Sequence, residues 1–407
     1  MANIPFPHRL VLNRYFLSVF GADVYNLDID PFRETTKSLV HDSLEGHEND
    51  GRSRYYVQLV ELLDEHSSIT PEMLLEYDEN IQRHTAFINE KRTNNIQWKY
   101  FQYLSLLFTE MYLDQYFRAP EDLLNSLNAH VDKFNASLLE WGEKKKDLLG
   151  YYEKTNLNKL SFWNATGSGK TLLMHINMLQ YKHYVKKHRK EHELNRIVVL
   201  TPNEGLTHQH LDEMKASNIL AGEFTKVAKR GGMFSADIVD VIDMNKLKEE
   251  GKKKTVSVDE FERNNLVLID EGHRGAKGDV WSEMRSRLAQ EGFTFEYSAT
   301  LGQAVSSKAS LAEEYSKNIL FDYSYRYFHA DGFGKDYQIL NIDSDEETIA
   351  DKENKQLYLT ACLLSFYQQN RVFRDRGAKY RAFAIDKPLW VFVGSKVTAV
   401  RKEQGKE

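Results

Sequence analysis

Residues 160–171 read LSFWNATGSGKT, a short apolar run followed by a turn that contains two glycines, a lysine and two threonines. The next apolar residues recur at helical spacing, so the turn connects a strand to a helix. Glycines let a loop wrap closely around an anion, and the first N–H groups of a helix point toward it. The pattern predicts a phosphate-binding loop formed by Thr166, Gly167, Ser168, Gly169, Lys170 and Thr171. Asn164 stands where the usual spaced motif has its first glycine, and the alternative is an ordinary glycine-rich turn.

Two adjacent carboxylates follow another apolar run, in the sequence LVLIDEGH at residues 266–273. Lys170 suits the β- and γ-phosphates of a nucleotide, and the Thr171 hydroxyl suits Mg²⁺. A Mg²⁺-nucleotide site also needs carboxylates, and a strand that ends in two acidic residues supplies them. Asp270 would complete the coordination of the metal, and Glu271 would polarise the attacking water.

Short apolar runs alternate with helical patterns beyond about residue 159, which predicts βαβ units and a parallel sheet. The runs occupy residues 160–163, 197–200, 238–242, 266–269 and 293–297. In such sheets ligands bind at the carboxyl ends of the strands. Ser298, Ala299 and Thr300 follow the last run, and we expect the hydroxyl groups of Ser298 and Thr300 to sense the acidic pair.

The first 150 residues show helical periodicity instead. Thr70-Pro71-Glu72 has the form of a helix N-terminus, and Pro120-Glu121-Asp122 opens another helix. Between them an aromatic stripe at three- and four-residue steps is typical of a packed core: Trp98, Phe101, Leu104, Phe108, Tyr112 and Tyr116. We therefore expect an all-α accessory domain at residues 1–150, before the sheet domain at residues 151–335.

The ordered series ATGSGKT, VVLTPNEGLTHQ, VLIDEGH and YSAT resembles the motifs of superfamily 2 helicases and translocases. Within them it looks most like the DEAD/DEAH-box motor of restriction-enzyme R subunits, the type III Res and type I R groups, over about residues 159–300. The resemblance implies a RecA-like P-loop NTPase with a parallel α/β sheet that uses ATP and Mg²⁺. It also implies metal binding by Thr171 and Asp270, hydrolysis by Asp270, Glu271 and Lys170, and communication between His273, Ser298 and Thr300.

Nucleic-acid contacts are implied by the same resemblance at Thr201, Pro202 and Gln209. Gly231 and Gly232 are added because they follow the basic residues Lys226, Lys229 and Arg230, so that exposed N–H groups adjoin positive charge. The sequence YFQYL at residues 100–104 resembles the aromatic-glutamine element that reads adenine. The alternative for Gln102 is a place on the polar side of a packed helix.

The C-terminal part has a helix-like stretch from about Glu346 to Arg376, within a linker expected at residues 336–387. Residues 388–394, PLWVFVG, resemble the first strand of a second RecA-like domain, truncated at residues 388–407. We therefore expect the front part of a longer protein. We also expect weak activity from this part alone, because the arginine-bearing motifs of the second domain are absent. A nuclease pattern is not found.

Composition excludes several classes of protein. The chain has 407 residues, with 54 Lys and Arg against 60 Asp and Glu, so a basic coat is excluded but a local basic groove is not. One cysteine excludes an internal disulfide framework, and no apolar run suits a membrane span or a secretory signal. We expect a cytoplasmic ATP-dependent DNA motor of a restriction–modification or phage-defence system. Its expected partners are double-stranded DNA and a methyltransferase or other defence subunit.

Two alternatives remain open. The first is an ATP-gated nucleic-acid-binding or scaffold module without strand movement. The second is a P-loop enzyme that acts on a small molecule or a protein.

Overall fold

The structure is a computed structural model of the 407-residue chain. It describes residues 4–63, 67–224, 238–246, 264–272, 287–306, 309–334, 352–381 and 385–391. The chain divides into two compact units, Met1–Lys335 and Asp336–Glu407.

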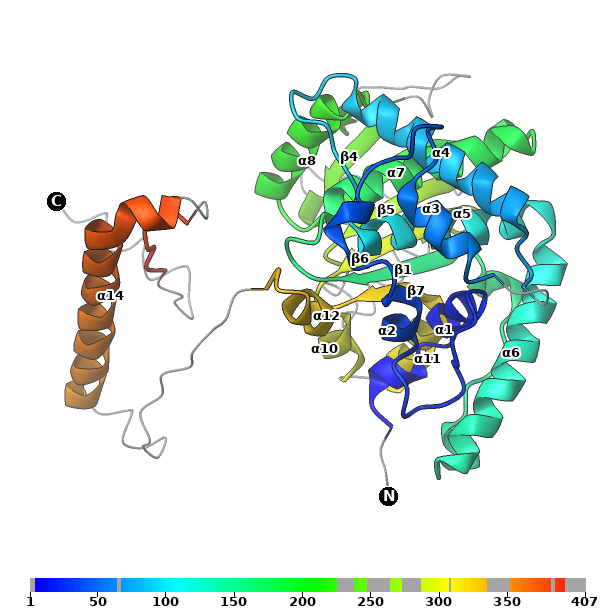
Figure 1. Ribbon diagram of the computed structural model, residues 1–407, viewed down its shortest axis with the longest axis horizontal. Helices are drawn as coiled ribbons and strands as arrows, with labels where there is room; N and C mark the ends of the chain where they lie inside the picture. The colour runs from blue at the N-terminus through cyan, green and yellow to red at the C-terminus, as the bar shows by residue number, and fades with distance from the viewer. Residues whose placement is uncertain are drawn as a thin grey trace. The chain divides into compact units, whose positions relative to one another are not determined.

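Seven parallel strands form one sheet in the first unit (Figure 1), in the order β3-β4-β2-β5-β6-β1-β7. The strands are β1 (Lys159–Asn164), β2 (Arg196–Thr201), β3 (Ala221–Glu223), β4 (Val239–Asp243), β5 (Asn265–Asp270), β6 (Phe293–Ser298) and β7 (Ile319–Tyr323). The predicted α/β class and parallel sheet are confirmed. The five predicted strands lie within one residue of their expected bounds, whereas β3 and β7 were not predicted.

Both faces of the sheet are covered, which explains why the strand sequences are continuously apolar. Successive strand residues point to opposite faces. Ile197 and Val199 of β2 join the large core beneath the helices, while Val198 and Leu200 belong to a second cluster on the other face. The described part of that cluster includes Leu288.

Helices of the N-terminal region are α1 (Val11–Ser18), α2 (Pro31–Thr36), α3 (Arg54–Val60), α4 (Pro71–Asn89), α5 (Tyr100–Arg118) and α6 (Pro120–Glu140). The predicted start of α4 is confirmed, because the Thr70 hydroxyl accepts the Met73 N–H at 3.3 Å and Pro71 is the first helical residue. α6 begins at Pro120, as expected.

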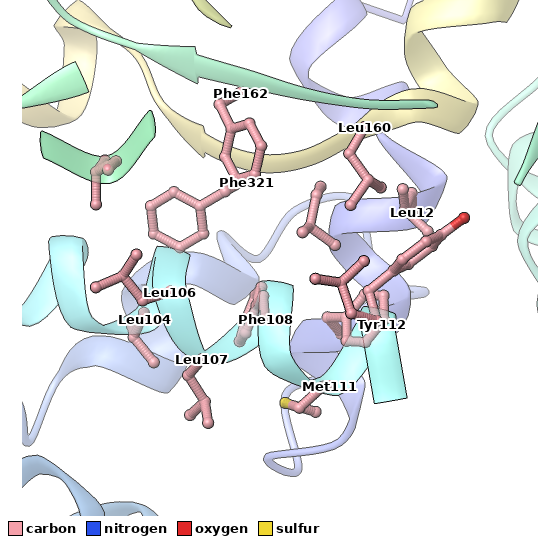
Figure 2. Close-up of a cluster of buried hydrophobic side chains, with 14 of the residues drawn as sticks. Leu12, Leu104, Leu106, Leu107, Phe108, Met111, Tyr112, Leu160, Phe162 and Phe321 are labelled. Carbon is pink, nitrogen blue, oxygen red and sulfur yellow. The ribbon is translucent and has the colours of Figure 1, made fainter. Parts of the chain in front are cut away.

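Helix α5 is buried between the sheet and the other helices, so its aromatic stripe belongs to the core, as the sequence predicted. Figure 2 shows Leu104, Leu106 and Phe108 of α5 beneath Phe162 of β1 and Phe321 of β7. A fully buried Leu or Phe contributes about 1.5–3 kcal/mol relative to an exposed one. This helix therefore joins the N-terminal helices to the sheet in one continuous core.

Five further helices of the first unit and one of the second are described. They are α7 (Lys170–Lys187), α8 (Glu204–Ala216), α10 (Leu301–Val305), α11 (Ala309–Asn318), α12 (Tyr325–Ala330) and, in the second unit, α14 (Lys352–Arg381). Short 3-10 helices occupy Phe6–Arg9, Asp42–Leu44, Lys145–Asp147, Lys154–Asn156, Glu191–Glu193 and Met244–Lys246. Among the described residues, none of these helices is both long and apolar enough to span a bilayer.

The expected strand at PLWVFVG is not seen in its described part. Residues 388–391 have no regular secondary structure, and Phe392, Val393 and Gly394 lie outside the described residues.

Candidate nucleotide site

The glycine-rich turn forms a tight loop between β1 and α7. Gly167 and Gly169 have φ angles of +88° and +89°, a region that side-chain-bearing residues rarely adopt. Gly169 is the residue before the first turn of α7, and a Cβ there would lie 2.5 Å from Gln102 Nε2. The loop is fixed at its start because the Ala165 N–H donates to the Tyr323 carbonyl at 2.9 Å. The loop ends at the N-terminus of α7, where the positive end of the helix dipole favours an anion.

Lys170 and Glu271 meet at the carboxyl edge of the sheet. Lys170 Nζ donates to Glu271 Oε1 at 3.1 Å, although the residues are 101 positions apart. The lysine side chain is 11% exposed and the glutamate 23% exposed, so both face a partly open site. The structure thus brings together the two sequence features on which the nucleotide hypothesis depends.

Asp270 is the last residue of β5, and both of its carboxylate oxygens are held. Oδ1 accepts the Glu271 N–H at 3.0 Å, and Oδ2 contacts His210 Nε2 of α8 at 3.0 Å. Burial by itself raises the pKa of Asp270, but the His210 contact and the Lys170 charge outweigh it and lower this pKa below the ordinary value. An ionised carboxylate beside a phosphate-binding loop fits a magnesium ion, which prefers oxygen ligands.

The turn after β5 carries backbone strain. Glu271 has φ +52°, uncommon for a residue other than glycine, and the Gly272 N–H donates to the Tyr297 carbonyl at 3.0 Å. This conformation directs Glu271 toward Lys170. His273, the next predicted coupling residue, lies outside the described residues.

Ser298 and Thr300 lie at the same edge, because β6 is paired with both β5 and β1. Asp270 is opposite Tyr297 in the register, so Ser298 comes immediately beyond the acid. The Ser298 hydroxyl accepts the Thr300 N–H at 3.1 Å. The Thr300 hydroxyl is buried and has no hydrogen-bond partner among the described residues.

Gln102 contacts the phosphate loop itself. Its Nε2 donates to the Ser168 carbonyl at 2.9 Å, while its Oε1 accepts the Lys99 N–H at 3.0 Å. The neighbouring Phe101 ring stacks on Tyr323 with centroids 3.8 Å apart. The glutamine therefore faces the site rather than solvent, and its carboxamide braces the loop in this conformation.

The candidate nucleic-acid residues have different surroundings. Thr201 is fully buried, and its hydroxyl bonds to the Thr207 hydroxyl at 2.6 Å and to the Ile242 carbonyl at 3.3 Å. Pro202 is half-buried and Gln209 is exposed. Gly231 and Gly232 lie outside the described residues. Among the described candidate residues other than Thr201, which are Pro202 and Gln209, only Gln209 has a polar side chain.

His210 was missed by sequence reasoning. A usable signal exists, because Thr207, His210 and Met214 follow one another at three- and four-residue steps and are all buried. A histidine on the inner side of an amphipathic helix needs a polar partner, and the carboxyl end of the adjacent sheet offers one.

Comparison with known families matches residues 119–303 to the type III restriction enzyme, res subunit. The matched segment extends from the start of α6 into α10 and contains the glycine-rich loop, Asp270, Glu271 and Ser298. No curated protein matches the chain.

Two solved structures are similar to parts of the chain. One is a Sulfolobus solfataricus SWI2/SNF2 ATPase core in complex with dsDNA, at 16% identity and TM-score 0.27, covering 42% of this chain and 34% of that one. The other is the UvsW helicase from bacteriophage T4, at 18% identity and TM-score 0.28, covering 40% of this chain and 54% of that one. The chain thus spans about a third and about half of these two structures.

Proposed function

We propose that this chain binds ATP with Mg²⁺ at the N-terminus of α7 and hydrolyses it as part of a nucleic-acid motor. The observation that carries the proposal is the 3.1 Å contact between Lys170 Nζ and Glu271 Oε1. It places the loop and the acidic pair at one site. The match of residues 119–303 to the type III Res family supports the same activity.

Each residue of the site has a role in this proposal. The N–H groups of residues 166–171 surround the phosphates, and Lys170 exchanges Glu271 for phosphate oxygens. Thr171 and Asp270 would hold the metal, which would supply positive charge beside the phosphates. Glu271, once released from Lys170, orients and polarises the attacking water. Gln102 is proposed to contact the nucleotide after its bond to Ser168 opens.

Double-stranded DNA is the proposed partner, contacted at Pro202, Gln209, Gly231 and Gly232 and beside Thr201. Ser298, Thr300 and His273 would relay the state of the nucleotide to that contact. We propose that this motor belongs to a restriction–modification or phage-defence system, with a methyltransferase or other defence subunit as partner. We also propose slow hydrolysis by this chain alone, because full activity is expected to need the arginine-bearing motifs of a second domain. An arginine finger contributes about 10³–10⁵ in rate.

The test compares the wild-type chain with Glu271→Gln, which keeps the size of the side chain but cannot act as a base. Binding of a fluorescent ATP analogue and release of phosphate are measured with and without duplex DNA. We expect both proteins to bind the analogue, and only the wild type to release phosphate, at a slow rate that DNA raises. Tighter DNA binding by Glu271→Gln without any wild-type turnover would favour a nucleotide-gated scaffold instead.

Salt dependence is a second check on the DNA contact. Because phosphate contacts release counterions, affinity for duplex DNA should fall steeply between about 50 and 200 mM salt. A flat response would contradict a groove that follows the DNA backbone.

A further inference from the structure

The contact between His210 and Asp270 joins the middle of helix α8 to the candidate metal site. His210 is 3% exposed and Asp270 is 8% exposed, and their side chains approach to 3.0 Å. Neither the phosphate loop nor the acidic pair contains this histidine. Its position is set by a helix that begins three residues after β2 ends.

The direction of this hydrogen bond follows from its partner. An ionised carboxylate only accepts hydrogen bonds, so His210 Nε2 carries the proton and donates. The other ring nitrogen, Nδ1, is buried and has no partner among the described residues. Since the Glu271 N–H already holds Oδ1, the histidine fixes the second oxygen and with it the plane of the carboxylate.

Helix α8 is itself held at both ends. At its start the Asn203 side chain accepts the Leu206 N–H at 3.0 Å. At its end Arg92, from the N-terminal helical region, donates to Glu213 at 3.0 Å and to the Ser217 hydroxyl at 2.7 Å. A ring carried on a helix with two fixed ends has little freedom to leave its carboxylate.

We propose that His210 is a positioning residue that holds the Asp270 carboxylate in the orientation required for magnesium binding. The inference rests on the proposed function, in which Asp270 is a metal ligand. Side chains that hydrogen-bond a ligating group typically change metal affinity or activity by about 10- to 100-fold when removed. The same effect is expected here, and it should appear in the magnesium requirement for nucleotide binding.

Three variants isolate this contact. His210→Phe keeps a ring and removes the donor. His210→Gln can place its amide N–H near the position of Nε2, whereas the amide of His210→Asn is too short to reach Asp270. His130→Phe is the matched control, because His130 is a buried histidine of α6 whose Nδ1 hydrogen-bonds the Tyr25 hydroxyl at 2.8 Å, not the acid.

The measurement is binding of a non-hydrolysable ATP analogue by the full chain as Mg²⁺ is titrated. We expect His210→Phe and His210→Asn to raise the half-saturating Mg²⁺ concentration about 10- to 100-fold. His210→Gln should stay close to the wild type, and so should His130→Phe. Analogue binding in excess EDTA should be equal in all of them, because the loop residues are unchanged.

The outcomes separate the two proposals. If the wild type does not bind the analogue, the proposed function fails. If the wild type binds in a magnesium-dependent way and His210→Asn keeps the wild-type magnesium requirement, the positioning role of His210 is overturned. If His210→Phe does not fold, as judged by thermal unfolding without nucleotide or metal, the comparison of His210→Gln with His210→Asn still decides. Equal shifts in those two variants would also contradict the inference.

Discussion

The carboxyl edge of the sheet and the interface between α5 and α7 each bury a carboxyl group, in opposite electrostatic surroundings. Asp270 at the edge lies beside His210 and the Lys170 charge, and its pKa is lowered despite burial. Glu110, fully buried on α5, has its pKa raised to about 7 by burial, which the Tyr184 hydroxyl and the Asn80 amide only partly offset. Burial alone favours the neutral acid, so the hydrogen-bond donors and charges around each carboxyl group decide whether its pKa ends above or below the ordinary value.

The largest expected effect tests the role of the Lys170 charge at the carboxyl edge of the sheet. Lys170→Met removes a charge-assisted contact to phosphate, worth about 3 kcal/mol, so affinity for an ATP analogue should fall about 100-fold. Fluorescence titration measures it. Lys186→Met, exposed near the other end of α7, is the control and should bind normally. Unchanged binding by Lys170→Met would place the nucleotide elsewhere.

The next test concerns Glu110, the buried carboxyl group whose pKa is raised. Between pH 4.5 and about 7 the folded state keeps a proton on Glu110 that the unfolded chain releases, so the free energy of unfolding falls as pH rises through this window. Glu110→Gln cannot ionise, so it should lose this slope and gain up to about 3 kcal/mol of stability at pH 8. Urea unfolding at pH 5 and pH 8 measures both effects.

The control for that experiment is Glu79→Gln, an exposed acid on α4. It should leave the pH dependence of unfolding unchanged. A Glu110→Gln variant that keeps the wild-type fall in stability between pH 5 and pH 8 would contradict a raised pKa of Glu110 in the folded state.

A smaller effect tests the fit of the phosphate loop. Gly169→Ala combines a left-handed residue, costing about 1–2 kcal/mol, with a Cβ placed against Gln102. Gly142→Ala has φ +90° with nothing within 4 Å, so it reports the conformational cost alone. In thermal unfolding we expect Gly169→Ala to be the more destabilised, and Gln102→Ala to relieve the difference. Equal losses in the two glycine variants would argue against a tight contact with Gln102.

The smallest expected effect concerns the hydrogen bonds between β6 and α7. The Tyr297 hydroxyl donates to Asn177 Oδ1 at 2.8 Å, and both residues are fully buried. Tyr297→Phe leaves that oxygen unpaired and should cost about 1–2 kcal/mol in urea unfolding. Tyr151→Phe, whose ring is 60% exposed, should change stability far less. No loss in Tyr297→Phe would mean that Asn177 finds another donor.

Local chemistry explains what the sequence predicts well. The phosphate loop and the acidic pair are short segments whose residues follow buried strands, so their meeting at one edge follows from the parallel sheet alone. The helix starts at Pro71 and Pro120 are equally local. Strand β7 was missed because Asp322 interrupts its apolar run and α11 leads into it directly, without a turn signal.

Tertiary packing accounts for the remaining misses. Thr201 points inward because β2 is flanked by β4 and β5, and no property of the TPNEG sequence specifies that orientation. The partner of His210 depends on how α8 turns over the end of β5. Gln102 faces the phosphate loop because α5 and α7 pack side by side, a pairing that periodicity does not specify.

The contacts of α1 and α2 with the end of the first unit bear on how the chain folds during synthesis. Asn13 of α1 donates to the Leu320 carbonyl at 2.9 Å, and Arg33 of α2 pairs with Asp331 at 2.6 Å. These partners leave the ribosome about 300 residues after the helices that need them. Synthesis proceeds at about 5–20 residues per second, so the partners of α1 and α2 near residues 320 and 331 emerge roughly 15–60 seconds after these helices. During that interval α1 can already pack against α2 and α6, whereas the side of α1 that contacts β7 still lacks its partner strand.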